Sequence, residues 1–133
     1  HSIAPMKKRG NGAIIATASV AGVIGFANSA PYIASKHAVC GLVKAAALEL
    51  AAAGIRVNAV APRAIDNRMF DSVVTQLSQE NAAALRAGIQ QSIPMKRYGA
   101  NEEIANLVAF LASDEASYCT GAIFLADGGL TTG

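Results

Sequence analysis

Three short segments predicted as strands alternate with helical segments, and this alternation restricts the fold of the chain more than any other feature. Residues 13–18 form a run of small and apolar residues, and residues 55–60 and 122–126 follow later in the chain. A short apolar run bounded by glycine is typical of a strand covered on both faces in a parallel sheet. Strands that alternate with helices are joined by right-handed crossovers. The sequence therefore predicts an α/β fold with three parallel strands and flanking helices.

Helical segments fill the stretches between these strands. We expect the end of a helix at residues 1–9, a long helix over about residues 32–52, helical segments over residues 66–92 with a break near residues 79–81, and a further helix that Asn101 caps. Proline is tolerated in the first turn of a helix and glycine favours its end, so Pro31 and Gly54 agree with the bounds of the long helix.

The long helix is apolar on almost every side, which indicates that it is buried on almost every side. One face is predicted to pack on the sheet and consists of Val39, Leu42, Val43, Ala46, Ala47 and Leu50. The opposite face consists of the small or apolar residues Gly41, Ala45, Leu48 and Ala52. We expect this second face to meet a partner helix, so that the protein forms a homo-oligomer through residues 32–52.

Tyr32 and Lys36 lie four residues apart near the start of this helix, so their side chains share one face. A phenol holds its proton too tightly for transfer at neutral pH, and a nearby ammonium favours its ionised form. Ser19 follows the first strand, at the carboxyl end of the sheet where ligands of open α/β folds bind. These side chains predict a site for carbonyl–alcohol interconversion; the alternative is a packed tyrosine beside a solvated lysine.

The order of these residues resembles the short-chain dehydrogenase/reductase family. The matching residues are Ser19, Tyr32-x-x-x-Lys36, Val57-Asn58-Ala59-Val60-Ala61-Pro62 and Asp127-Gly128-Gly129. The resemblance implies a Rossmann-like, doubly wound parallel sheet and an oxidoreductase that uses NAD or NADP. It implies that Tyr32 exchanges a proton with the substrate oxygen, that Ser19 orients this oxygen, and that Lys36 supports Tyr32 and binds the nicotinamide ribose. Ser19, Tyr32 and Lys36 are thus the candidate catalytic residues, and Tyr32 and Lys36 also contact the cofactor.

The segment after the second strand departs from the family pattern, which usually reads Pro-Gly-x-x-x-Thr. This chain has Pro62-Arg63-Ala64-Ile65-Asp66-Asn67. The resemblance places Pro62, Ile65 and Asn67 against the cofactor, with the backbone of Ile65 on its carboxamide. Arg63 replaces a glycine that suits close approach of the backbone to the cofactor. Its role stays open between a surface position and a partner for an acidic substrate or a phosphate.

The sequence contains no glycine-rich strand-to-helix turn of the kind that holds a dinucleotide pyrophosphate. In the resembling family this turn belongs to the N-terminal half. We therefore expect residues 1–133 to be the C-terminal half of a single Rossmann-like domain, without its dinucleotide-binding half and inactive in isolation. The alternative is a truncated or non-catalytic chain that acts as an interaction or structural module.

Composition argues against several other classes of function. Although 53% of the residues are hydrophobic, no apolar run reaches the ~18–20 residues of a membrane span. The net charge is +2, and the one basic cluster, Met6-Lys7-Lys8-Arg9, is expected to be the solvated end of a helix and not a nucleic-acid site. Cys40 and Cys119 are too few for a disulfide framework and indicate a cytoplasmic protein, and no histidine or cysteine cluster has metal-ligand spacing. The expected partner is a small carbonyl or alcohol compound. The apolar loop at residues 20–30 suggests that this compound is largely hydrophobic; the alternative is that the loop is apolar only because it packs against the rest of the protein.

Overall fold

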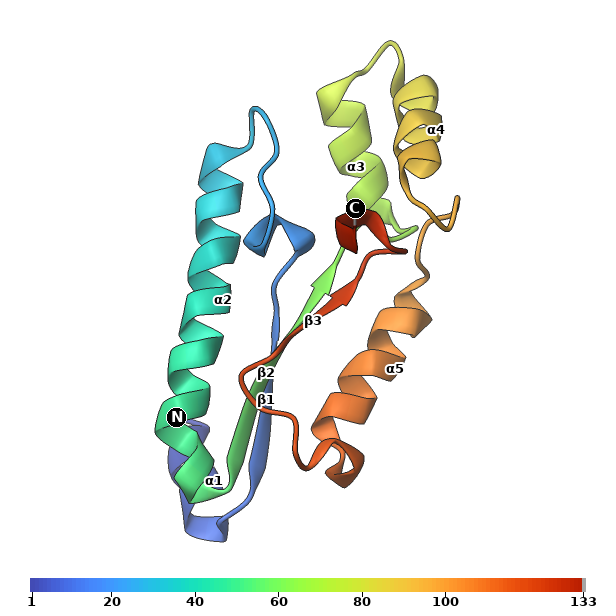
Figure 1. Cartoon of the computed structure of the whole chain (residues 1–133). Helices are drawn as coiled ribbons and strands as arrows, with labels where there is room; N and C mark the ends of the chain where they lie inside the picture. Colours follow the sequence, from blue (N-terminus) through green and yellow to red (C-terminus); the bar gives the residue numbers. More distant parts are fainter. Residues whose placement is uncertain (133) are drawn as a thin grey trace.

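The computed structural model describes residues 1–132 as three parallel strands with helices on both faces of the sheet (Figure 1). The α-helices and strands, in chain order, are α1 (Ile3–Arg9), β1 (Gly12–Thr17), α2 (Ala30–Leu50), β2 (Ile55–Pro62), α3 (Arg68–Leu77), α4 (Ala82–Ser92), α5 (Asn101–Ala112) and β3 (Ile123–Ala126). Single 3-10 turns η1 (Val20–Gly22), η2 (Ala51–Ala53), η3 (Asp114–Ala116) and η4 (Leu130–Thr132) complete the chain.

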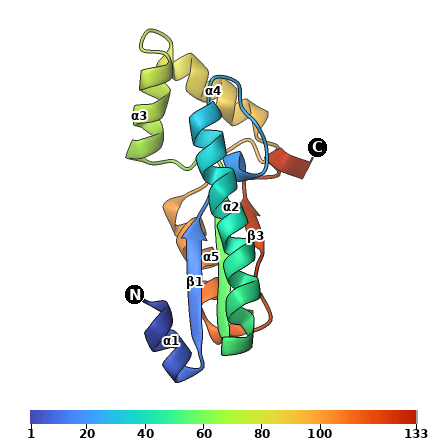
Figure 2. The same cartoon turned by 90° about the vertical axis from the view of Figure 1, so that its left-hand side faces the viewer.

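The sheet has the order β1-β2-β3, and both pairs of neighbouring strands are parallel. Gly12 pairs with Ile55 at the start of the first ladder, and Pro62 pairs with Ala126 at the end of the second. Helix α2 covers one face of the sheet and α5 covers the other, as two views at right angles show (Figures 1 and 2). The predicted α/β fold with three parallel strands and flanking helices is confirmed.

Side chains from the strands point to the two faces in turn and form two cores. Val57, Ala59 and Ala61 of β2 pack toward α2, whereas Val60 lies in the cluster with Leu111 of α5. This alternation follows from the two-residue period of a strand. Because both faces are covered, the apolar residues of β2 need no polar face, which explains the near-continuous apolar run.

Strand β1 is less buried than the sequence predicts. Its residues are half-buried up to Ala16, and Thr17 is exposed, whereas most of β2 is buried. The reason is position, because β1 is an edge of the sheet in residues 1–132 and has β2 as its single neighbour there. Covering of both faces by helices therefore does not fully bury a strand that lacks a second neighbour.

Two glycines fix the turns that precede β1 and β2, at the amino ends of these strands. Gly10 follows α1 and Gly54 follows η2, and both have the left-handed backbone that ends helices, with φ of 68° and 72°. A Cβ on Gly54 would lie 2.2 Å from the Gly10 carbonyl oxygen, so the two turns pack backbone against backbone. The predicted end of the long helix near Gly54 is confirmed, and close approach adds a second reason for glycine there.

Two details of the helix predictions are wrong. The face of α2 that was predicted to pack on the sheet includes Leu42, but this residue is 69% exposed. The buried face of α2 is narrower than predicted and consists of Cys40, Val43, Ala47 and Leu50. Asn101 is the first residue of α5 and not its cap; Ala100 precedes the helix, and its N–H donates to Glu103. The carboxylate of Glu103 thus binds the N–H of the residue before the helix, and no side chain of residues 1–132 caps the N–H groups of the first turn.

The outer face of α2 carries apolar side chains that residues 1–132 do not cover. Leu42 and Leu48 are exposed, and Gly41 and Ala45 lie exposed between them. None of the helices described in residues 1–132 combines the length and apolar character needed to cross a membrane. An exposed apolar face on a long helix is the feature expected of a contact with another chain.

Candidate active site

The six residues predicted from the sequence gather at one end of the molecule. The carboxyl ends of the strands, the first turns of α2 and the α3–α4 hairpin all lie at this end (Figure 1). The predicted residues there are Ser19, Tyr32, Lys36, Pro62, Ile65 and Asn67. Parallel strands place ligands at their carboxyl ends, so the fold puts these residues where a ligand site is expected.

Ser19 leaves β1 in an extended conformation and caps the short turn η1. Its hydroxyl oxygen accepts a hydrogen bond from the Ala21 N–H at 3.2 Å. A serine hydroxyl has one donor and two acceptor positions, so this bond fixes the oxygen and leaves the O–H available. Ser19 can therefore donate a hydrogen bond to a carbonyl oxygen without giving up its own anchor.

A glycine allows η1 to pack directly on α2. A Cβ on Gly22 would lie 2.6 Å from the Sγ atom of Cys40 and 2.8 Å from the backbone carbonyl oxygen of Lys36. These distances are shorter than real Cβ contacts, so any larger residue would push the two elements apart. The approach holds the turn that carries Ser19 against the helix that carries Lys36.

Tyr32 and Lys36 share one face of α2, as their spacing predicts. The Lys36 Nζ atom lies 5.7 Å from the centre of the Tyr32 ring and donates a hydrogen bond to the Thr17 carbonyl at 3.1 Å. Lysine has three N–H donors, so two remain for a ligand. Tyr32 is 51% exposed, and its hydroxyl has no hydrogen-bond partner among residues 1–132. The phenol is thus presented to a ligand beside a fixed cation.

The backbone of Ile65 offers one free donor and one free acceptor. Ile65 forms a parallel bridge with Gly99, in which Gly99 N–H donates to Ala64 and Asp66 N–H donates to Gly99. In this pattern the N–H and C=O of Ile65 itself point away from the bridge, and neither is bonded within the described residues 1–132. A primary carboxamide can donate one N–H to an acceptor and accept one hydrogen bond through its oxygen, so the backbone groups of Ile65 are complementary to the nicotinamide carboxamide.

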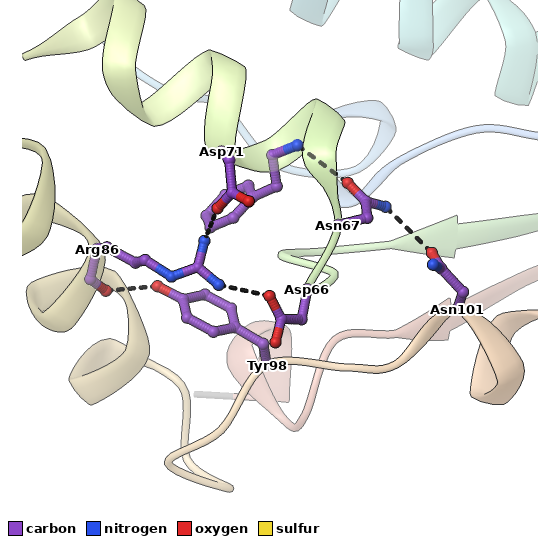
Figure 3. A network of polar contacts seen from close by, with 7 residues as sticks. Asp66, Asn67, Asp71, Arg86, Tyr98 and Asn101 are labelled. Atoms are coloured by element: carbon purple, nitrogen blue, oxygen red, sulfur yellow. Dashed lines mark hydrogen bonds and ion pairs between the residues drawn. The ribbon is translucent and has the colours of Figure 1, made fainter.

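Asn67 has a structural role that the sequence did not reveal. Its side-chain oxygen accepts from the Phe70 N–H at 3.0 Å and caps α3, while its Nδ2 donates to Asn101 at 3.1 Å (Figure 3). An amide retains a second N–H and a second lone pair after these two bonds. The capping of α3 by Asn67 is therefore observed, whereas its contact with the cofactor stays a prediction.

The α3–α4 hairpin, expected over residues 66–92 with a break near 79–81, is confirmed and is tied down by Arg86. The Arg86 guanidinium pairs with Asp66 and Asp71 and lies 4.8 Å from the centre of the Tyr98 ring (Figure 3). The Tyr98 hydroxyl donates to the backbone carbonyl of Arg86, and burial raises the pKa of Tyr98. One arginine thus links the hairpin to the segment that precedes α5.

The side chain of Arg63 lies between the end of β2 and the loop before α2. Its guanidinium carbon is 4.6 Å from the centre of the Phe26 ring. Burial lowers the pKa of Arg63 against the opposing influence of Tyr32 and Tyr98. The side chain of Arg63 is thus half-buried and in contact with an aromatic ring, and its role stays open between a partly exposed position and a partner for an acidic substrate or a phosphate.

Asn58 is the one buried polar side chain in the described core. Its Nδ2 donates to the Cys119 carbonyl at 2.7 Å, and its Oδ1 accepts from the Ala122 N–H at 3.1 Å. These bonds hold the segment before β3 against β2 and keep the sheet in register. A polar amide inside an otherwise apolar strand was the signal for this role, because buried polar groups are nearly always hydrogen-bonded.

Comparison with known proteins identifies the family of the chain. The family model described as Enoyl-(Acyl carrier protein) reductase matches residues 1–131. The chain belongs to the short-chain dehydrogenase/reductase family. Levodione reductase from Leifsonia aquatica is 44% identical over 124 residues, which are 93% of this chain and 46% of that protein. Cyclohexanol dehydrogenase from Acinetobacter sp. (strain SE19) is 43% identical over 92% of this chain and 45% of that protein.

Solved structures of short-chain dehydrogenases show the same fold. The crystal structure of levodione reductase superposes with a TM-score of 0.93 at 42% identity, over 96% of this chain and 49% of that one. A gluconate 5-dehydrogenase from Burkholderia cenocepacia J2315, in complex with NADP and tartrate, gives a TM-score of 0.86 at 30% identity, over 96% and 48%. The chain therefore spans about half the length of the relatives that it matches.

Proposed function

We propose that this chain carries the proton-transfer site of an NAD(P)-dependent oxidoreductase that interconverts a carbonyl and a secondary alcohol. The observation that carries the proposal is the placement of Lys36 5.7 Å from the Tyr32 ring centre. In addition, η1, which Ser19 caps, packs on the same helix. Membership of the short-chain dehydrogenase/reductase family supports the reaction class.

The three side chains divide the chemistry of the substrate oxygen. Ser19 donates a hydrogen bond to this oxygen, and Tyr32 gives it a proton in reduction or removes one in oxidation. Lys36 favours the ionised phenol, because a nearby cation stabilises the negative form. When bound, the nicotinamide of NAD or NADP supplies or accepts the hydride.

The residues present fit a nicotinamide at the same end of the sheet. The two free N–H groups of Lys36 suit the ribose hydroxyls, and the free backbone groups of Ile65 suit the carboxamide. We place Pro62 and Asn67 beside them, as the resemblance implies. Solved relatives hold NADP, which supports this class of cofactor, and the choice between NAD and NADP stays open.

Lys36→Ala tests the proposal. In the full-length protein, with cyclohexanone as a neutral probe, we expect turnover to fall by roughly 10²-fold, because the phenol loses its cation. We also expect weaker binding of NADH and NADPH, because the donors to the ribose are lost. The measurements are dinucleotide absorbance during reduction and calorimetric titration with each dinucleotide.

Lys44→Ala is the matched control, because Lys44 lies on the same helix and is exposed. It should leave both turnover and dinucleotide affinity unchanged. If Lys36→Ala behaves like this control, the site assignment is wrong. If the unaltered protein binds neither dinucleotide and reduces no ketone, the alternative of a non-catalytic interaction module is correct.

Association through the outer face of α2 is the second part of the proposal. Gly41 and Ala45 are small and exposed beside the exposed Leu48, so a second α2 helix can pack closely there. Gly41→Arg or Ala45→Arg should shift the protein toward monomers in analytical ultracentrifugation. Lys44→Arg, on the same helix without a new charge, should leave the mass unchanged; unchanged mass in both test variants would contradict this interface.

The remaining parts concern the whole protein. We propose that these residues form the C-terminal half of a Rossmann-like domain, and that residues 1–133 alone do not turn over substrate. The substrate is a small carbonyl or alcohol compound. The free thiols of Cys40 and Cys119 support a cytoplasmic location.

A further inference from the structure

Arg63 is a half-buried cation without an anionic partner. The three ion pairs described within residues 1–132 involve Arg86 and Arg97, and Arg63 takes part in none of them. Its Nε atom is buried and has no hydrogen-bond partner in that part of the chain. Charged side chains are rarely buried unless they are paired, because desolvation of the charge is costly. Within residues 1–132, the charge of Arg63 therefore meets the Phe26 ring but no anion.

The direction of the Arg63 side chain is fixed from both sides. Its backbone N–H donates to the Ala126 carbonyl at 3.2 Å, which holds the end of β2 against β3. Its guanidinium carbon lies 4.6 Å from the centre of the Phe26 ring, in the loop before α2. The planar guanidinium is pre-organised, so it loses little freedom when it forms further hydrogen bonds. Arg63 is thus held ready at the edge of the site.

The terminal nitrogens of Arg63 remain available. Neither terminal nitrogen has a hydrogen-bond partner among residues 1–132. In that part of the chain, Nε of Arg63 is the one side-chain atom that is both buried and unpaired, so the terminal nitrogens are not buried in the same way. The terminal nitrogens can therefore be reached from outside. Arg63 follows β2, and its guanidinium contacts Phe26 in the loop that leads from η1 to α2, so it lies at the carboxyl end of the sheet where Ser19 and Tyr32 also lie.

We propose that Arg63 binds a carboxylate of the substrate, next to the carbonyl or alcohol group that Tyr32 serves. This inference rests on the proposed function, because it takes the Tyr32 end of the site as the place of reaction. A guanidinium binds a carboxylate through two parallel N–H···O bonds, and such charge-assisted bonds are stronger than neutral ones. The apolar loop around Phe26 then contacts the hydrocarbon part of the same molecule. The substrate class is a keto acid or hydroxy acid with an apolar body.

Binding of two ligands of the same shape tests this site without requiring turnover. Calorimetric titration of the full-length protein, saturated with NADP⁺, compares cyclohexanecarboxylate with the uncharged cyclohexanecarboxamide. We expect the carboxylate to bind roughly 10–100-fold more tightly, as one charge-assisted pair implies. Arg63→Met should remove this preference, and Arg63→Lys should retain part of it because the charge stays while the two-pronged geometry is lost.

Arg68→Met is the matched control, because Arg68 is an exposed arginine at the start of α3. It removes the same charge nearby and should leave the preference for the carboxylate intact. Equal affinity of the unaltered protein for the two ligands overturns the proposal, and this comparison needs no variant. A preference that persists in Arg63→Met overturns it as well, because the anion then binds elsewhere.

A neutral ketone separates the failure of this site from failure of the proposed function. Arg63→Met should reduce 4-methylcyclohexanone at a rate within about 3-fold of the unaltered protein, and should lose roughly 10–100-fold in kcat/KM with 4-oxocyclohexanecarboxylate. Loss of both activities together, with a shifted pH profile for the neutral ketone, would show that Arg63 acts on Tyr32 and overturn the proposal. Carboxylate binding that depends on Arg63, without reduction of either ketone, would refute the oxidoreductase and leave the anion site standing.

Discussion

Tyr32→Phe is expected to lower turnover by at least ~10²-fold, because it removes the one group at this site that can exchange a proton with the substrate oxygen. The ring and its contacts on α2 remain, so the variant should fold as the unaltered protein does. The measurement is the steady-state rate of cyclohexanone reduction by the full-length protein with NADH and with NADPH. Dinucleotide affinity should fall less than turnover, since Lys36 and Ile65 are unchanged.

Tyr118→Phe provides the matched control for this substitution. Tyr118 is fully exposed and lies in the turn after η3, far along the chain from the strand ends that form the site. Loss of its hydroxyl should leave the rate unchanged. Near-normal activity in Tyr32→Phe would refute the assignment of the proton donor, and an equal loss in both variants would point to a general effect on folding.

The architecture was predictable because its determinants are local. Residues 13–18 are apolar between turn residues, and Gly54 ends a helix by adopting a backbone that other residues avoid. The spacing of Tyr32 and Lys36 fixes their shared face through helix geometry alone. Such features depend on residues within a few positions of each other, so the sequence displays them directly.

The errors and omissions have a different origin. The prediction for Leu42 fails because α2 is apolar on nearly every side, and periodicity cannot then say which apolar residues face the sheet. Arg86 is separated by 15 residues from Asp71 and by 20 from Asp66 in the chain. No local sequence pattern relates these residues, so their ion pairs can be recognised only once the arrangement of α3 and α4 in space is known.

Arg63 shows how a departure from a family pattern gains meaning from structure. The sequence shows only that Arg63 replaces a glycine of the family pattern. It does not decide whether Arg63 is a surface residue, binds a phosphate or binds an acidic substrate. Its contact with Phe26 and its lack of an anionic partner within residues 1–132 favour a ligand-binding role over a plain surface role. The burial of Arg63 and its lack of an ion-pair partner depend on residues far away in the chain, so the motif alone could not indicate them.

Asn58→Ala is expected to destabilise the fold strongly, although Asn58 lies outside the proposed catalytic residues. Asn58 is 1% exposed and satisfies the Cys119 carbonyl and the Ala122 N–H. Each buried group left without a partner costs about 1–3 kcal/mol, so the free energy of unfolding should fall by on the order of 2–5 kcal/mol. Urea denaturation of the full-length protein measures this fall. The same truncation at the exposed Asn106 of α5 should change stability by less than ~0.5 kcal/mol.

Asn58→Asp separates the two hydrogen bonds through pH. The introduced carboxyl keeps an acceptor for the Ala122 N–H, but when ionised it cannot donate to the Cys119 carbonyl and carries an uncompensated buried charge. Its folded-state pKa should therefore be raised above the usual value of ~4. The destabilisation relative to the unaltered protein should grow as pH rises above ~4 and level off above the raised pKa. A penalty for Asn58→Asp that is constant from about pH 4 to pH 8 would show that the donor to Cys119 and the burial of the site do not govern stability here.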